Sequence, residues 1–345
     1  MSRIGILTGG GDCPGLNGVI CGIVERASQL GHEVIGFRRG WKGLLGNSQP
    51  IKLESDDVED IQLAGGTILG ASRIDPFNEP DGPELVKKNM ERHGCDLLLP
   101  IGGDQTLKIA SRIAKLGIKL VGIPKTLDNN LSLTDYTFGF TTACNIASEA
   151  IERLRTSARS RDGLIVVEVL GAQSGWIALY SGVAGGAHMA LIPEAPFAMR
   201  EIYDMIKRRR KIGKEYAVIV VAEGARPKSA PQLKDYEKHR AALESLLEGS
   251  GIASWLVKQI QDKTGREAQS VTLGNIQRGG APTAFDRVLG MRLGVQAVDL
   301  AHAGKFGLMA ALHGTKLTGV LLDEAVKTIK TVPPELYAEM SMFFA

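Results

Sequence analysis

Short runs of apolar residues alternate along the chain with longer segments in which apolar positions recur every three or four residues. The short runs are rich in β-branched residues and have the length of strands that are buried on both faces. The longer segments have the spacing of helices with one apolar face. The predicted strands are residues 3–8, 33–37, 96–101, 119–123, 165–170, 189–193 and 217–222. The predicted helices include residues 15–30, 83–93, 107–116, 145–159 and 255–264.

This alternation of strands and helices predicts βαβ units, and therefore parallel sheets that are covered by helices on both faces. The chain has 345 residues, which is more than one ordinary hydrophobic core accommodates, so we expect two domains. A first set of units ends near residue 140 and a second begins near residue 141, while residues 257–305 fit either set. The expected fold class is α/β, with two Rossmann-like, three-layer domains whose sheets are mostly parallel.

Composition and charge narrow the class of ligand. The net charge of +3 argues against a dedicated nucleic-acid binder and suits small anionic ligands. No apolar run reaches the roughly 18 residues of a membrane helix, and the first residues lack a signal-peptide pattern. The one strong charge run, KRRRKIGK at 207–214, predicts either a solvated helix face or a pocket for an anionic effector. The cysteines form no CxxC pair, as expected of free thiols in the cytoplasm; they are Cys13, Cys21, Cys95 and Cys144.

Glycine clusters follow two of the predicted strands. GGGDCPGLN begins at residue 9, and GGDQTLK begins at residue 102. Glycines allow backbone N–H groups to approach a phosphate, and the helix start behind them carries partial positive charge. Each cluster also contains an aspartate, Asp12 or Asp104, and a carboxylate beside a phosphate loop is explained by a cation such as Mg²⁺. Two such loops at the carboxyl ends of parallel strands predict a phosphate site with Asp104 as the metal ligand.

The loop IPKTLDNN, at residues 123–130, places three polar side chains directly after another predicted strand. Transfer of a phosphoryl group to an alcohol needs a clamp on the donor, a cation that neutralises the migrating charge, and a base for the hydroxyl proton. Lys125 suits the clamp, Thr126 a hydrogen-bonding partner, and Asp128 the base, with Arg73 as a further cation. The alternative is that Asp128 and Asn129 only cap a turn.

Seven blocks of the sequence resemble, in order and spacing, the motifs of the phosphofructokinase A family. The resemblance covers roughly residues 1 to 320. It implies two α/β domains around a cleft, and a Mg²⁺-dependent transfer of phosphate to the 1-hydroxyl of fructose 6-phosphate. The blocks are ILTGGGDCPGLN, GGTILGASR, PIGGDQT, IPKTLDNN, VVEVLGAQSGWIA, VVAEGA and LGNIQRGGAPTAFDR.

The resemblance implies roles for individual residues and for the domains. Residues 1–140 with about 257–305 would bind the donor, and residues 141–256 with about 306–325 the sugar, before a C-terminal extension at 326–345. It also implies a homo-oligomer, a dimer or tetramer, whose active sites share residues between subunits. The catalytic set is Asp128, Thr126, Arg73 and Lys125. The donor set is Gly10, Gly11, Arg73, Gly103, Asp104, Gln105, Thr106 and Lys125, with Asp104 at the metal. The substrate set is Thr126, Asp128, Leu170, Gly171, Gln173, Glu223, Gln269, Asn275 and Arg278.

Two positions bear on the phosphoryl donor. In the family that this chain resembles, ATP users typically read GGDG and PGTIDND, whereas pyrophosphate users read GGDD and PKTIDND. This chain has Lys125, as pyrophosphate users do, and Gln105, which matches neither pattern. The glutamine side chain is larger than aspartate and should crowd an α-phosphate, yet its amide could also donate a hydrogen bond to one. ATP and pyrophosphate both stay open, and the pair favours pyrophosphate slightly.

The acceptor pocket departs from the family pattern. Three arginines and a histidine that hold the sugar's 6-phosphate in the family are here Gly163, Ala172, Gln269 and Asn275, and only Arg278 remains. Hydrogen bonds to charged groups are worth about 1.5–3 kcal/mol each, so losing two or three should weaken binding by several kcal/mol. The sequence therefore predicts transfer to the 1-hydroxyl of a ketose with a neutral or singly charged tail, such as sulfofructose. The alternatives are an ordinary glycolytic 6-phosphofructokinase making fructose 1,6-bisphosphate, and an inactive regulatory paralogue.

Overall fold

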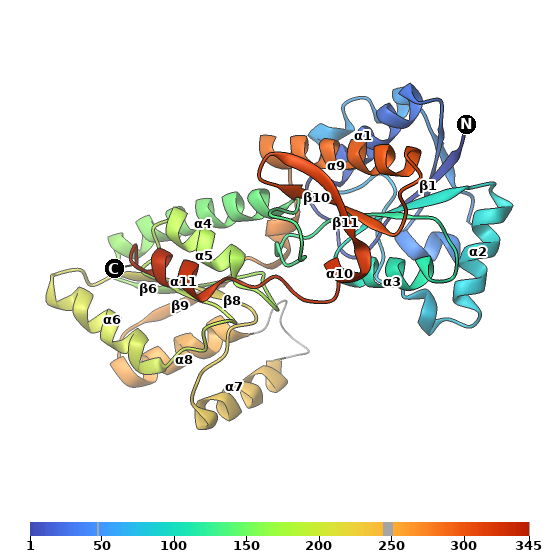
Figure 1. Cartoon of the computed structure of the whole chain (residues 1–345). Coiled ribbons are helices and arrows are strands. Elements are labelled where there is room, and N and C mark those ends of the chain that lie inside the picture. Colours follow the sequence, from blue (N-terminus) through green and yellow to red (C-terminus); the bar gives the residue numbers. More distant parts are fainter. Residues whose placement is uncertain (47, 244–250, 345) are drawn as a thin grey trace. The chain divides into compact units, whose positions relative to one another are not determined.

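The computed structural model describes residues 1–46, 48–243 and 251–344, and these form two compact units (Figure 1). The first unit comprises Met1–Thr142 and Arg278–Ile329. The second comprises Ala143–Gln277 and Lys330–Ala345. Each unit is an α/β fold around its own sheet, as the alternation of strands and helices predicts.

The first unit contains a seven-stranded sheet in the order β11-β10-β5-β4-β1-β2-β3. Its inner strands run parallel, and the edge strands β3 and β11 are antiparallel to their neighbours. The strands are β1 Arg3–Thr8, β2 Glu33–Phe37, β3 Ile51–Leu53, β4 Leu97–Gly102, β5 Val121–Pro124, β10 Leu308–His313 and β11 Lys316–Leu321. The helices are α1 Leu16–Gln29, α2 Gly82–Arg92, α3 Asp104–Ala114, α9 Ala284–His302 and α10 Leu322–Ala325, with 3₁₀ turns η1 Gly40–Leu44, η2 Ser55–Val58, η3 Ile61–Leu63 and η4 Pro76–Asn78.

Apolar burial and one close helix contact hold the first unit together. Every residue of β4 is buried, as expected of a central parallel strand covered on both faces. Helices α1 and α9 lie side by side along the sheet (Figure 1). A Cβ atom at Gly22 would lie 2.2 Å from the carbonyl oxygen of Met291, so the two helix backbones meet only because residue 22 is glycine.

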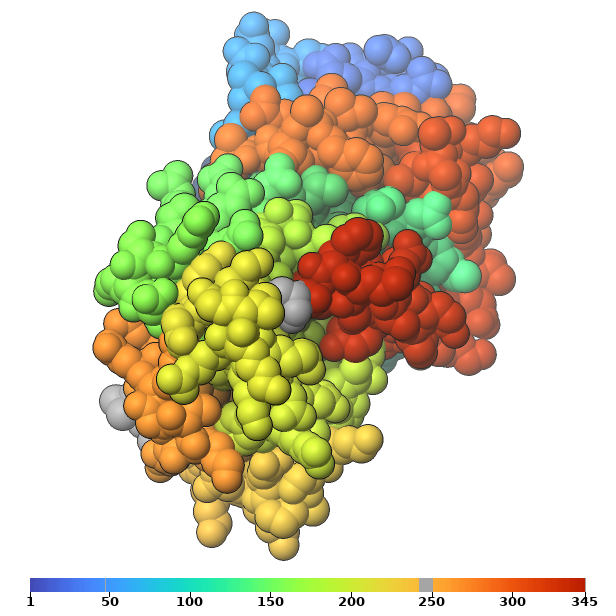
Figure 2. Space-filling view, turned by 90° about the vertical axis from the view of Figure 1, so that its left-hand side faces the viewer, coloured from blue at the N-terminus to red at the C-terminus, as the bar shows by residue number. Residues whose placement is uncertain are grey.

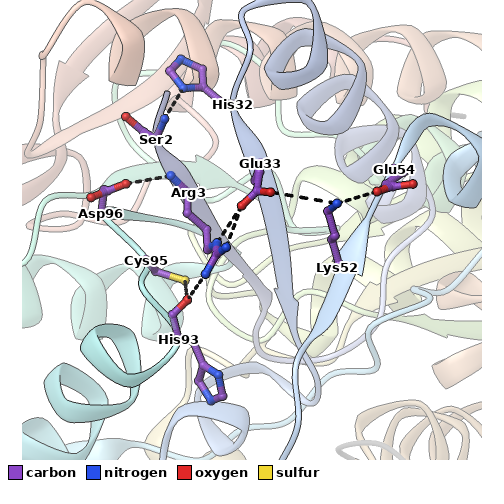
Figure 3. Close-up of polar contacts among 9 residues, drawn as sticks. All are labelled: Ser2, Arg3, His32, Glu33, Lys52, Glu54, His93, Cys95 and Asp96. Carbon is purple, nitrogen blue, oxygen red and sulfur yellow. Dashed lines mark hydrogen bonds and ion pairs between the residues drawn. The ribbon is translucent and has the colours of Figure 1, made fainter.

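Ion pairs and hydrogen bonds join the amino ends of the strands in this sheet (Figure 3). Arg3 donates from Nε to Glu33 at 2.9 Å and from Nη1 to the carbonyl of His93 at 2.9 Å. Its backbone N–H donates to Asp96 at 2.7 Å, and Lys52 pairs with Glu54 at 2.7 Å. Arg3 and Lys52 at this edge thus have carboxylate partners. We therefore expect a phosphate site at the opposite edge, where the parallel strands have their carboxyl ends.

The second unit contains a four-stranded, fully parallel sheet in the order β7-β8-β6-β9. Its core combines apolar strand residues with the inner faces of α6 and α8. The strands are β6 Leu164–Val169, β7 Met189–Leu191, β8 Ala217–Ala222 and β9 Ala268–Thr272. The helices are α4 Phe140–Ser160, which begins in the last residues of the first unit, α5 Trp176–Ala184, α6 Met199–Lys211, α7 Ala230–Leu243, α8 Ile252–Thr264 and α11 Pro334–Ser341, with the 3₁₀ turn η5 at Gly274–Arg278.

Two segments belong to a different unit from the one that the sequence predicts. Residues 257–277 belong to the second unit, because β9 pairs with β6. Residues 306–325 belong to the first, because β10 pairs with β5. The predicted C-terminal extension begins in the first unit and enters the second only at Lys330.

The cysteines, the basic run and the helix lengths bear on the expectations from composition. The four cysteines form no disulfide, as predicted. Within the basic run most side chains are exposed, but Arg209 is buried and donates from Nε to the carbonyl of Tyr216 at 2.9 Å. No helix among the described residues is both long enough and apolar enough to cross a membrane.

Candidate functional site

Three loops meet at the carboxyl ends of β1, β4 and β5 in the first unit. These strands are neighbours in the sheet, with Thr8 opposite Ile101 and Gly102 opposite Pro124. Backbone hydrogen bonds continue past the strand ends: Gly9 N–H donates to Ile101 at 2.8 Å, and Lys125 N–H donates to Gly102 at 2.9 Å. The two glycine clusters and the loop after β5 therefore form one surface, as the motifs predict.

Glycine is required where two of these loops touch. The side chain of Thr106 is buried between them. A Cβ atom would lie 2.6 Å from this side chain at Gly9 and 2.3 Å from it at Gly102. Neither position accommodates a larger residue without displacing Thr106, so the glycines set the spacing of the loops.

Three cationic side chains converge on the first glycine cluster. Lys125 Nζ donates to the carbonyl of Gly11 at 2.6 Å. A Cβ atom at Gly11 would lie 3.1 Å from Nη1 of Arg278 and 3.9 Å from Nη2 of Arg73. Burial lowers the pKa of Lys125, and the charge of Arg278 lowers it further. Cations gathered around glycine backbone are suited to binding phosphate oxygens.

Asp128 lies near the same cations. Burial raises the pKa of its carboxyl group, while Arg278 and then Lys125 oppose that rise. A carboxylate with a raised pKa accepts a proton more readily than an ordinary aspartate, which suits a general base. Asp128 N–H donates to Thr126 Oγ1 at 3.1 Å, so the two side chains assigned to catalysis share one turn.

Asn129 caps the turn that follows Asp128. Asn129 has a φ of +49°, and its Oδ1 accepts from Thr137 N–H at 3.1 Å. Thr137 Oγ1 in turn donates to the carbonyl of Thr126 at 2.8 Å. These bonds fix the loop from within.

Asp104 is the first residue of α3, at the edge of the second glycine loop. Its Oδ2 accepts from Lys108 Nζ at 2.9 Å, one helical turn further on. Among the described residues no group of three or more His, Cys, Asp or Glu side chains could hold a metal ion. A single carboxylate nevertheless suits Mg²⁺, which usually keeps several waters and takes its other ligands from substrate phosphates. The spacing of four residues between Asp104 and Lys108 is visible in the sequence and is the signal that indicates this pair.

A cavity of about 710 Å³ opens beside these loops. It is lined by Gly10, Arg73, Gln105 and Thr106 of the predicted donor set, and Gln105 is exposed there. The cavity wall also contains side chains that sequence reasoning did not identify, among them Ser72, Lys108, Arg112, Asp323 and Lys327. The volume falls in the usual range for small-ligand sites and accommodates either a short or a nucleotide donor.

In the second unit, one part of the predicted acceptor set gathers at the carboxyl ends of β6 and β8. Glu223 N–H donates to the carbonyl of Val169 at 3.0 Å, and its Oε1 accepts from Gly171 N–H at 3.3 Å. Gly171 has a φ of +135° and turns the loop that follows β6. In this loop Leu170 is buried and Gln173 is exposed. Glu223 and Gln173 therefore belong to one surface, whereas Leu170 packs inside.

Gln269 lies at the other end of the same sheet. It is the second residue of β9 and pairs with Ile165, near the amino end of the parallel sheet. The strand length of about 3.3 Å per residue puts it well over 10 Å from Gly171. It lines a small cavity of about 170 Å³ together with Arg161, Gly163 and Arg266. Asn275 is exposed beyond the carboxyl end of β9.

This two-unit α/β chain, which has glycine-rich loops at the ends of parallel strands, is similar to known phosphoryl-transfer enzymes. The family described as Phosphofructokinase matches residues 3–301. The chain is 49% identical over 346 residues to a pyrophosphate–fructose 6-phosphate 1-phosphotransferase of Amycolatopsis methanolica, covering 99% of both sequences. It is 47% identical over 338 residues to ATP-dependent 6-phosphofructokinase 3 of Streptomyces coelicolor, covering 98% of both.

A solved structure agrees in fold. Pyrophosphate-dependent phosphofructokinase from Marinobacter aquaeolei superposes with a TM-score of 0.83 at 22% identity, covering 100% of this chain and 92% of that one. The chain thus belongs to the phosphofructokinase family and is a phosphotransferase.

Proposed function

We propose that this protein transfers a phosphoryl group from pyrophosphate or ATP to the 1-hydroxyl of fructose 6-phosphate, in the cytoplasm. The observation that carries the proposal is the convergence of Lys125, Arg278 and Arg73 on Gly11, with Asp128 beside them. The names of the similar proteins support fructose 6-phosphate as the acceptor. An idle paralogue would have no reason to keep base, clamp and Asp104 together.

Each residue has a physical task in this reaction. Lys125 and Arg73 hold the donor's phosphate oxygens and stabilise the charge that the migrating group carries. Arg278, which the sequence assigns to the sugar, lies beside Gly11, so we assign it to the donor phosphates as well. Asp128 accepts the proton of the acceptor hydroxyl, and Thr126 orients the reacting groups. Mg²⁺, when bound, neutralises phosphate charge, and Asp104 would hold it.

The acceptor proposal replaces our preference from sequence. A sugar with a neutral or singly charged tail finds no support among the relatives, which are named as a fructose 6-phosphate 1-phosphotransferase and a 6-phosphofructokinase. The replaced cations are the one observation in its favour. At the amino end of the second sheet, Arg161 and Arg266 lie beside Gly163 and Gln269, together with Asp162 and Glu267. Arg266 also pairs with Glu215 at 3.5 Å. Since that end is remote from Glu223 within one chain, we propose that a second copy of the chain completes each acceptor site.

A donor-by-acceptor matrix tests the proposed function. Pyrophosphate and ATP are each combined with fructose 6-phosphate, sulfofructose and unphosphorylated fructose, and the products are identified by ³¹P NMR. We expect fructose 1,6-bisphosphate with at least one donor and a far higher kcat/KM for fructose 6-phosphate than for the other two sugars. Faster turnover of sulfofructose than of fructose 6-phosphate would favour the singly charged tail instead.

We further propose pyrophosphate as the preferred donor, because the exposed Gln105 side chain takes up space in the donor cavity. Replacing Gln105 by glycine should raise the ratio of kcat/KM for ATP to that for pyrophosphate by about tenfold, since relieving one steric conflict is worth on the order of 1–2 kcal/mol. Gln49, which is exposed on the same unit and outside this cavity, is the position for a control Gln→Gly change. An unchanged ratio in the Gln105 variant would show that this side chain does not select the donor.

Restoring positive charge at Gln269 tests the acceptor assignment. We expect Gln269→Arg to lower KM for fructose 6-phosphate by about tenfold, the effect of one added charge-assisted hydrogen bond to a phosphate. KM for the donor should not change. Ser270→Arg, one position along β9 and equally exposed, is the control for added charge alone. If both variants lower KM to the same extent, the effect is long-range attraction and Gln269 does not face the sugar phosphate.

A further inference from the structure

Glu194 joins two segments of the second unit that are far apart in the sequence. It follows β7, and both oxygens of its carboxylate accept from Gly175 N–H at 3.0 Å. Its Oε1 also accepts from Val332 N–H at 2.9 Å. Gly175 is the N-cap residue of α5 and offers no side chain for capping, so the carboxylate also compensates the positive end of that helix.

Gly175 ends the loop that carries part of the candidate acceptor site. The loop, residues 170–175, is held at its beginning by Glu223, which accepts from Gly171 N–H, and at its end by Glu194. A buried Ser174 and an exposed Gln173 lie between the two anchors. The direction in which Gln173 projects therefore depends on both carboxylates.

Val332 belongs to a short C-terminal segment, residues 328–332, which we call the strap. Ser132 Oγ donates to the carbonyl of Thr328 at 2.8 Å, and Leu131 pairs with Ile329 in an antiparallel bridge. Both contacts lie within the first unit, directly after the loop that carries Asp128. The first end of the strap is thus bound to the chain that follows the proposed base.

The rest of the strap is bound within the second unit. Trp176 Nε1 donates to the carbonyl of Lys330 at 3.2 Å, and Val332 is buried. Beyond the strap, the hydroxyl of Tyr337 on α11 donates to the carbonyl of Ala190 at 3.0 Å. Figure 2 shows this C-terminal segment, in red, lying against the yellow-green chain of the same unit.

We propose that Glu194 is a positioning residue that holds the acceptor loop and, through the strap, the chain behind Asp128. The inference rests on the proposed function, because it assigns loop 170–175 to the acceptor. One carboxylate accepts hydrogen bonds from the N–H groups of both Gly175 and Val332. Val332 lies in the same strap as Thr328 and Ile329, which contact the first unit. Loss of Glu194 should therefore loosen the acceptor loop, the strap and residues 128–134 together.

Hydrogen exchange and steady-state kinetics on the full chain test this inference. In Glu194→Ala we expect amide exchange about tenfold faster in peptides covering residues 171–178, 328–334 and 128–134, the size of effect of losing one hydrogen bond to a charged group. KM for fructose 6-phosphate should rise about tenfold while KM for the donor stays the same. Glu194→Gln keeps one accepting oxygen and should give an intermediate result. Glu339→Ala, an exposed change on α11, is the control.

A second variant reaches the strap without touching Glu194. Val332→Pro removes the N–H that Glu194 accepts and keeps a compact apolar side chain. It should speed exchange in residues 128–134 and 328–334 and leave the bond between Glu194 and Gly175 in place. Unchanged exchange in residues 128–134 in both variants, or an acceptor KM equal to that of the control in Glu194→Ala, overturns the proposal. Hydrogen exchange can be measured without enzymatic turnover. It therefore tests the role of Glu194 even if the proposed activity is wrong.

Discussion

Replacing Asp128 by asparagine is expected to lower kcat by about 10²- to 10⁴-fold, the range that a positioned general base contributes. The amide has the shape of the carboxylate but cannot accept the proton of the acceptor hydroxyl. The backbone N–H of Asp128, and not its side chain, donates to Thr126 Oγ1. The substitution should therefore leave this turn in place. Steady-state rates, with thermal unfolding to check the fold, measure the effect.

The pH dependence of the wild-type rate also tests whether Asp128 is the base. Burial raises the pKa of Asp128, so the wild-type rate should fall with decreasing pH at values above the range of an ordinary aspartate. Below that pKa the carboxyl group is protonated and no longer acts as a base. Asp135→Asn, an exposed change in the same connection, is the control and should keep both rate and profile. If Asp128→Asn retains the wild-type acid limb, another group is the base.

Replacing Lys125 by methionine is expected to lower kcat/KM for the donor by about 10²- to 10³-fold, the cost of removing one preorganised donor from a charged transition state. Its Nζ bonds to the carbonyl of Gly11, where the donor phosphates are proposed to bind. Methionine has a similar length and removes a buried charge whose pKa burial already lowers. The substitution also leaves the Gly11 carbonyl without this donor, so we expect the thermal midpoint to fall modestly.

The control for this change lies at the other end of the same strand. Lys119 precedes β5 and is exposed, so Lys119→Met should keep kcat/KM within about twofold. Acceptor KM separates a donor clamp from a general loss of structure, because only the donor parameters should change in Lys125→Met. Equal losses for donor and acceptor would mean that Lys125 supports the whole loop and does not hold the donor in particular.

Much of the fold follows from the pattern of apolar runs. All seven predicted strands are present, because central parallel strands are continuously apolar and bounded by turn residues. The four missed strands lack that pattern. β3 has three residues, β9 reads AQSVT with three exposed positions, and β11 is a half-exposed edge strand. β10 reads LMAALH, an apolar run that could equally be helical.

The candidate site was predictable where it depends on strand ends. The loops after β1, β4 and β5 meet because parallel strands end at one edge. The position of Arg278 beside Gly11 depends on a contact between residues 267 positions apart, which no local pattern indicates. The family resemblance assigns Arg278 to the sugar phosphate and not to this loop. The separation of Gln269 from Gly171 depends on how β9 pairs with β6, and a strand that was not predicted offers no register.

The most direct test of the account is the rate at which the wild-type protein forms fructose 1,6-bisphosphate from fructose 6-phosphate and pyrophosphate, with ATP in a parallel reaction. The account predicts saturable turnover with at least one donor, the new phosphate on the 1-carbon, and no comparable rate with unphosphorylated fructose. Absence of that product with both donors, in a preparation that phosphorylates another sugar, would contradict it.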